Sequence, residues 1–129
     1  MNNPINISGA NLEDLMENFL KTNNLPYTRN SNGVDFIVGS NQYYIECKNQ
    51  TQGGSVIEKL PHTIWKYKMK YDFDSLYIVQ PYTDGMGKVM EHIKWLENTM
   101  GIVVYIVSYD SMCNILINSN IESPSMYWD

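Results

Sequence analysis

The sequence predicts an α/β fold in which helices flank a central mixed sheet. Segments with a helical spacing of apolar residues alternate along the chain with segments rich in β-branched and aromatic residues. Residues 34–48 have the pattern of a β-hairpin. Residues 102–107 are almost continuously apolar, which is typical of a strand buried on both faces.

The first half of the chain is expected to contain a helix, three strands and a second helix. The first helix is predicted at 8–23, where apolar residues recur at helical spacing: Leu12, Leu15, Met16, Phe19 and Leu20. A short strand at 27–30 precedes the hairpin. Ser55 and Glu58 form a capping box, and Pro61 then interrupts the helix. Either a separate turn precedes a helix with Pro61 at its first position, which we favour, or one helix is kinked there.

The second half adds a strand at 75–80, a helix at 88–100 that Gly101 ends, and the apolar strand at 102–107. A final strand is predicted at 112–117, and a polar tail begins at about 118. The aromatic residues that follow Pro61 are assigned to the core: Trp65, Tyr67 and Tyr71.

Composition indicates a single folded domain over residues 1–129. No apolar run is long enough to span a membrane and no signal peptide precedes the domain, so a cytoplasmic protein is expected. The net charge of −5 argues against a generic nucleic-acid binder. Residues 46–70, however, contain five lysines and two glutamates, a local charge of +3.

The hairpin places two carboxylates opposite each other. If Ser40 and Asn41 form the turn, paired residue numbers sum to 81, and Asp35 faces Glu46. Side chains alternate along a strand. One face therefore carries the apolar set Val34, Phe36, Val38, Tyr43, Ile45 and Cys47, and the other carries Asp35, Glu46 and Lys48.

Opposed carboxylates repel each other at a separation of roughly 5 Å between Cβ atoms. The repulsion is on the order of a few kcal/mol, and Lys48 offsets only part of it. A divalent cation would neutralise the pair, and Mg²⁺ prefers carboxylate oxygens together with water and substrate phosphates. The hairpin thus predicts a magnesium site suited to a phosphodiester substrate, at which Mn²⁺ can substitute.

Asp35 followed by Glu46-Cys47-Lys48 resembles the signature of the PD-(D/E)XK nucleases, although Val34 stands where the name of the motif has Pro. The run Glu46-Cys47-Lys48-Asn49-Gln50, with Gly54-Ser55-Val56-Ile57-Glu58-Lys59 after it, is similar to a subgroup of restriction-type endonucleases. The resemblance implies a restriction-endonuclease-like core and a metal-dependent deoxyribonuclease.

The resemblance also implies roles for particular residues. Asp35, Glu46, Lys48 and Gln50 are the expected catalytic residues, and Asp35, Glu46 and the backbone carbonyl of Cys47 are the expected metal ligands. Lys59, His62 and Lys66 are expected to contact DNA. Glu58 is a candidate accessory residue, as is one of the two acids on the first helix, Glu17 or Glu13.

Three functions remain open at this point. The first is a Mg²⁺-dependent restriction- or homing-type endonuclease that acts on DNA as a homodimer or homotetramer. The second is a Holliday-junction or other structure-specific nuclease, and the third is a catalytically silent DNA-binding or assembly protein with the same fold. The abundance of Asn, Tyr and Ile suggests an AT-rich phage or mobile element acting in a host cytoplasm.

Overall fold

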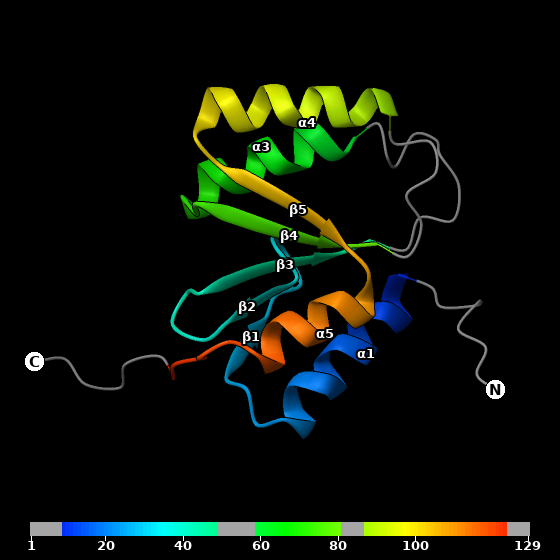
Figure 1. Ribbon diagram of the computed structural model, residues 1–129, viewed down its shortest axis with the longest axis vertical. Coiled ribbons are helices and arrows are strands. Elements are labelled where there is room, and N and C mark those ends of the chain that lie inside the picture. The colour runs from blue at the N-terminus through cyan, green and yellow to red at the C-terminus, as the bar shows by residue number, and fades with distance from the viewer. Residues whose placement is uncertain (1–8, 49–58, 81–86, 124–129) are drawn as a thin grey trace, which may run out of the picture.

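Two layers of helices enclose a five-stranded sheet in the computed structural model, which describes residues 9–48, 59–80 and 87–123 (Figure 1). The helices are α1 (Gly9–Thr22), α3 (Leu60–Tyr71), α4 (Gly87–Met100) and α5 (Tyr109–Ile117). The strands are β1 (Tyr27–Arg29), β2 (Phe36–Val38), β3 (Tyr43–Cys47), β4 (Ser75–Val79) and β5 (Val103–Val107). The predicted α/β class with a central mixed sheet is confirmed.

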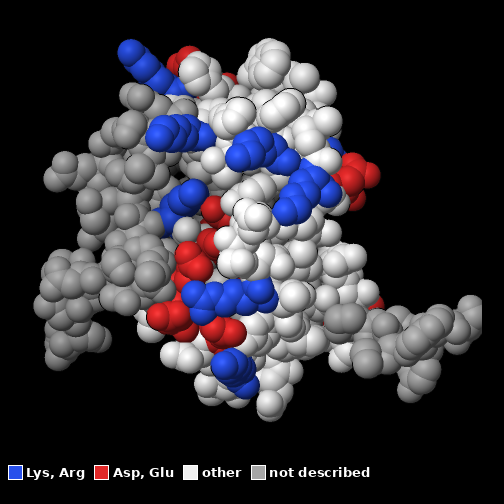
Figure 2. Space-filling model, turned by 180° about the vertical axis from the view of Figure 1, so that it is seen from behind, with Lys and Arg blue, Asp and Glu red and all other residues white. Residues whose placement is uncertain are grey.

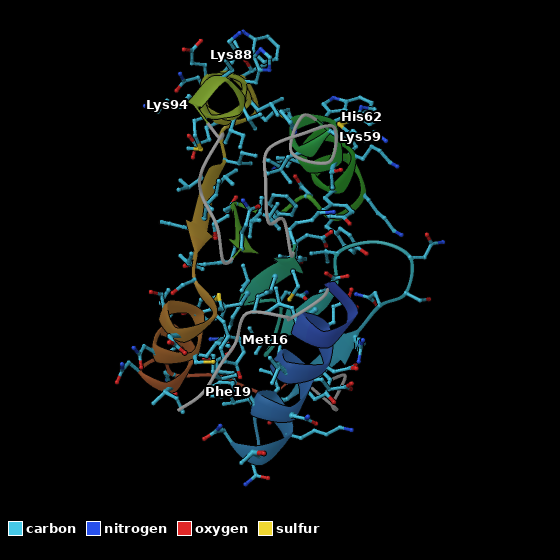
Figure 3. The ribbon with its side chains drawn as sticks, turned by 90° about the vertical axis from the view of Figure 1, so that its right-hand side faces the viewer. Met16, Phe19, Lys59, His62, Lys88 and Lys94 are labelled. Atoms are coloured by element: carbon cyan, nitrogen blue, oxygen red, sulfur yellow. The ribbon has the colours of Figure 1, made fainter. Side chains whose placement is uncertain are left out.

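The sheet is mixed because it joins a meander to parallel strands. Its spatial order is β1-β2-β3-β4-β5; β1, β2 and β3 pair antiparallel, whereas β3, β4 and β5 pair parallel. Parallel neighbours require crossover connections, and α3 and α4 lie in those connections. The parallel strands therefore end at the same edge of the sheet, which is the edge seen in Figure 3.

The predicted hairpin register is confirmed, since Phe36 pairs with Ile45 and Val38 pairs with Tyr43. Phe36, Val38 and Ile45 pack under α1 and α5, in a core that includes Leu12, Met16, Met112 and Leu116. The prediction for Val34 is wrong: its fully buried side chain belongs to the second core, on the side of α3 and α4. Val34 precedes the first residue of β2, so strand alternation does not apply to it.

The second core occupies the opposite face of the sheet. It combines Leu76, Ile78 and Val104 of the strands with apolar residues of α3 and α4, among them Ile64 and Ile93. Helices therefore cover both faces of the central strands (Figure 1). Asp35, directly before β2, is half-buried and Glu46 of β3 is buried, so neither acid lies on an open sheet face.

Strand β5 is less buried than its apolar sequence predicts. Val103 and Tyr105 are 45% and 42% exposed, because β5 is an edge strand and its face there is only partly covered. Tyr105 stacks on Tyr77 of the neighbouring strand, with ring centroids 4.7 Å apart. The expectation of burial on both faces is thus wrong for this strand.

The strand predicted at 112–117 is a helix. Ser108 caps α5, and its Oγ accepts a hydrogen bond from the backbone N–H of Ser111 at 3.1 Å. Met112 and Leu116, four residues apart, are both fully buried. The nine residues of α5 form a helix on which Met112 and Leu116 lie one turn apart and pack into the first core.

Helix α3 begins at Leu60, one residue before the start favoured from the sequence, with Pro61 in its first turn. The separate turn predicted before it falls outside the described residues. The Ser55–Glu58 capping box lies outside the described residues. In the described part of the chain, no helix has the length and apolar character needed to cross a bilayer.

Candidate active site

Glu46 and Lys48 lie at the end of β3, on the side of the sheet that faces α3. The Glu46 side chain is buried, with 4% of the residue exposed. Lys48 Nζ is 3.2 Å from Glu46 Oε2, and the Lys48 side chain remains 27% exposed. The buried carboxylate of Glu46 thus forms an ion pair with the partly exposed ammonium group of Lys48 at the edge of the sheet.

Asp35 is joined to the same strand by two hydrogen bonds between main chain and side chain. Its backbone N–H donates to Glu46 Oε1 at 3.1 Å, and its Oδ2 accepts from the backbone N–H of Cys47 at 2.8 Å. Each acid is therefore held by the strand that carries the other. The structure brings Asp35, Glu46 and Lys48 together as the hairpin register predicts.

Burial makes both carboxylates harder to ionise. Desolvation, followed by the charge of Glu46, raises the pKa of Asp35 to about 7. Desolvation also raises the pKa of Glu46, against the opposing effects of Lys48 and Tyr67. Lys48 lowers the pKa of both acids but does not offset the effect of burial, so added positive charge would favour their ionised forms.

Tyr67 of α3 is part of this site, although the sequence assigned it to the core. Its hydroxyl group lies 3.1 Å from Glu46 Oε2 and 3.0 Å from the carbonyl oxygen of Gly33. Gly33 has φ of +137°, and a Cβ there would meet the Tyr71 hydroxyl oxygen at 2.1 Å. Helix α3 thus contacts both segments that carry the acids.

The first helix contributes a second group of charges. Arg29 of β1 forms ion pairs with Glu13 at 3.2 Å, Asp14 at 3.1 Å and Glu17 at 2.6 Å. Glu17 also accepts a hydrogen bond from the Tyr27 hydroxyl group, and these contacts lower its pKa. Arg29 therefore pairs with both candidate acids, Glu13 and Glu17. Glu17 is held by Tyr27 as well, whereas the charge of Glu13 raises the pKa of Asp35.

The residues predicted to contact DNA lie on the exposed side of α3. Lys59, His62 and Lys66 are all exposed. Figure 2 shows basic side chains spread over the upper part of this face and acidic side chains gathered below them. The other predicted site residues, Gln50 and Glu58, lie outside the described residues.

The donor atoms of the site suit a hard divalent cation. Asp35 and Glu46 provide carboxylate oxygens, and Asp35 Oδ2 accepts a hydrogen bond from the backbone N–H of Cys47. In the described ranges, no three side chains of His, Cys, Asp or Glu are grouped to share one ion. A cation here would thus complete its shell with main-chain oxygens, water or substrate, as Mg²⁺ commonly does.

Comparison with known proteins agrees with this geometry. Residues 25–108 match the family model described as a PD-(D/E)XK nuclease superfamily domain, and this range contains β1 to β5 together with Asp35, Glu46 and Lys48. No curated protein and no solved structure matches the chain significantly. The matched range covers most of the chain, and the protein belongs to the PD-(D/E)XK nuclease superfamily.

Proposed function

We propose that this nuclease-family protein is a Mg²⁺-dependent DNA endonuclease of the restriction or homing type. The observation that carries the proposal is the joined group of Asp35, Glu46 and Lys48, with 3.2 Å between Glu46 Oε2 and Lys48 Nζ. Two acids that repel each other in a partly dry site destabilise the protein unless a cation or a substrate compensates for them. The raised pKa of Asp35 indicates the same requirement.

Asp35 and Glu46, with the backbone carbonyl of Cys47, would hold the ion, and Mn²⁺ would be accepted in place of Mg²⁺. When bound, the ion would supply a Lewis acid that lowers the pKa of a water molecule and neutralises charge on the phosphoryl oxygens. Gln50, the next residue expected on this face, is proposed to orient water or a phosphate oxygen.

Lys48 supplies the positive charge that this chain itself contributes. Its ammonium group is partly exposed, so it can reach a phosphate while it remains beside Glu46. There it would orient the attacking water and stabilise the charge that develops in the transition state. Lys48 directly follows β3, and its backbone N–H donates to the carbonyl oxygen of Val79 at 2.8 Å, so the sheet fixes the position of Lys48 beside Glu46.

Accessory roles follow from position. We propose that Tyr67 orients Glu46 through its hydroxyl group. Arg29 pairs with both acids of α1, but Glu17 also accepts from Tyr27, whereas the charge of Glu13 acts on Asp35; Glu13 is therefore the better candidate for the accessory acid. We also propose Glu58 as an accessory residue. Lys59, His62 and Lys66 would contact DNA phosphates along the exposed side of α3.

The proposed assembly is a homodimer or homotetramer. Each chain carries one group of Asp35, Glu46 and Lys48, so cutting both strands of a duplex in one binding event takes two chains. Sedimentation with and without a DNA duplex would measure this directly.

Cleavage of supercoiled plasmid in Mg²⁺ tests the function. We expect the wild-type protein to nick or linearise the plasmid, and we expect Asp35→Asn and Lys48→Ala to reduce the rate by at least about a hundredfold. Asp74→Asn and Lys21→Ala are matched controls, because both residues are exposed and lie away from the site. Full activity of either site variant would refute the assignment.

A parallel screen separates the substrate classes. The same enzyme would be incubated with linear duplex, a four-way junction and a flapped duplex, in Mg²⁺ and in Mn²⁺. Preferential cutting of the junction or the flap would favour the structure-specific nuclease. No cutting of any substrate would favour a silent DNA-binding protein.

A further inference from the structure

Two tryptophan side chains stand exposed on neighbouring helices. Trp65 of α3 is 45% exposed and Trp95 of α4 is 64% exposed. Positions two residues apart on a helix point about 200° apart, so Trp65 faces away from the side on which Tyr67 reaches Glu46. The expectation that Trp65 belongs to the core is therefore wrong, and neither residue is explained by the packing of the sheet.

The tryptophans belong to an apolar groove of about 340 Å³ between the two helices. The groove is lined by Pro61, His62, Trp65, His92, Trp95 and Leu96. The His62 ring already stacks on Trp65, with centroids 5.8 Å apart and an interplanar angle of 21°. Flat rings are thus presented on a surface that accepts further stacking.

Positive charge flanks the groove. Residues 59–71 contain four lysines and no acid, in a chain with a net charge of −5. Lys68 and Lys70 bond to Asp72, Phe73 and Asn32, which do not line the groove, so Lys59 and Lys66 are the lysines of this segment left to flank it. Lys66 lies one helical turn after His62, and Lys88 lies one turn before His92, whereas Glu91 is the acid one turn before Trp95. Figure 3 shows His62 on α3 and Lys88 on α4 on the outer side of the helix pair.

This charge distinguishes between two possible occupants. A symmetric dimer through the groove would bring the same patch of both copies together, and therefore two copies of the lysine-rich segment 59–71. A single-stranded nucleic acid complements both the lysines and the exposed rings, because its phosphates are negatively charged and its bases can stack on the rings. Paired bases in a duplex offer no free faces for such stacking.

We propose that the groove between α3 and α4 binds a single-stranded segment of the DNA substrate by stacking bases on Trp65 and Trp95. The proposal rests on the proposed function for the identity of the substrate. Its consequence is that DNA with an unpaired segment, such as a flap or an open junction, binds more tightly than fully paired DNA of the same length. Among DNA nucleases, this preference favours the structure-specific type over the restriction or homing type, so only the identification of DNA as the substrate is taken from the proposed function.

Fluorescence anisotropy with a labelled oligothymidylate, and with the matching blunt duplex, tests the proposal. The full-length Asp35→Asn protein would be used without divalent metal, so that cleavage cannot occur. We expect the single strand to bind more tightly than the duplex. Trp65→Ala and Trp95→Ala should each weaken binding of the single strand by about fivefold or more, which corresponds to one stacked base.

Two controls separate stacking from general damage. Tyr105→Ala removes another exposed aromatic residue on a different element and should leave the affinity unchanged. Trp65→Phe and Trp95→Phe retain an aromatic face and should preserve most of the affinity.

Lys66→Gln tests the electrostatic contribution. It should weaken the binding of both the single strand and the duplex, and it should reduce the slope of log affinity against log salt concentration by about one.

The outcomes are distinct. Unchanged single-strand affinity in both Trp→Ala variants overturns the proposal, as does equal binding of single strand and duplex. Conversion of a dimer to a monomer by these variants, with unchanged DNA affinity, would overturn it in favour of a second copy. Plasmid cleavage by the wild-type protein separates the failure of the groove proposal from the failure of the proposed function. If the plasmid is cut but the tryptophan variants bind DNA normally, only the groove proposal fails. If binding depends on the tryptophans but no plasmid is cut, only the nuclease proposal fails.

Discussion

Asp35 should make the metal-free protein less stable as the pH rises, and Asp35→Asn should remove that dependence. The folded protein holds the pKa of Asp35 at about 7, against an ordinary value of 3.8, through burial and the charge of Glu46. Between about pH 4 and pH 7 the unfolded chain loses this proton while the folded chain keeps it. The folded state then binds more protons, so the free energy of unfolding falls as the pH increases.

The size of the effect follows from the same values. A rise from 3.8 to about 7 corresponds to about 4 kcal/mol for a fully buried carboxyl group. Asp35 is only partly buried, and solvent screening reduces the cost, so we expect ~2 kcal/mol. The asparagine side chain can still accept from the Cys47 N–H but carries no charge, so the destabilisation above pH 7 disappears.

Urea unfolding in the presence of a chelator, at about pH 5 and about pH 8, measures this difference. The wild-type protein should lose ~1 kcal/mol more than Asp35→Asn between the two conditions, because part of the ~2 kcal/mol is already lost below pH 5. Mg²⁺ added at the higher pH should then stabilise the wild-type protein and have little effect on the variant. Asp74→Asn, an exposed control, should behave as wild type. Identical pH dependence of the wild-type protein and Asp35→Asn would refute the reasoning.

Three further predictions concern the elements around the site. Tyr67→Phe should raise the Mg²⁺ concentration for half-maximal cleavage about tenfold, because Glu46 loses a hydrogen-bond donor, while the melting temperature changes little; an unchanged Mg²⁺ titration would remove Tyr67 from the site. Gly33→Ala should destabilise the fold by about 1–3 kcal/mol, since φ of +137° is strained for alanine and the new Cβ meets the Tyr71 hydroxyl group; thermal melting measures it. Ser108→Ala should cost about 1 kcal/mol through loss of the α5 cap, and Ser108→Gly only a few tenths, in urea unfolding.

The hairpin shows how far local pattern can determine a site. Alternation along two strands leaves one register in which the acids avoid the apolar face, and that register is present in the structure. The positions of Asp35, Glu46 and Lys48 relative to one another follow from it. Both ends of α1 and α4 and the start of α3 are also within a few residues of their predicted positions, because apolar spacing, Pro61 and Gly101 act within one or two turns.

Helix α5 shows where local pattern is ambiguous. Short apolar runs such as 112–117 have no periodicity long enough to separate a strand from a helix. The sequence feature that indicates a helix here is Ser108, whose hydroxyl group caps the first turn of α5. Tyr67 is a second case: Leu60, Ile64, Tyr67 and Tyr71 share one helical stripe, which separates them from Trp65, but the spacing says nothing of the carboxylate that Tyr67 would meet.

The sequence by itself determined the paired strands, their register and the cluster of two acids with one lysine, because these depend on neighbours within about a dozen residues. Only the tertiary structure decided that Tyr67 reaches Glu46, that Arg29 occupies Glu17, and that Trp65 and Trp95 stand open on one surface. Those contacts depend on how whole helices dock on the sheet. Docking is set by the summed packing of two cores, which no short stretch of sequence encodes.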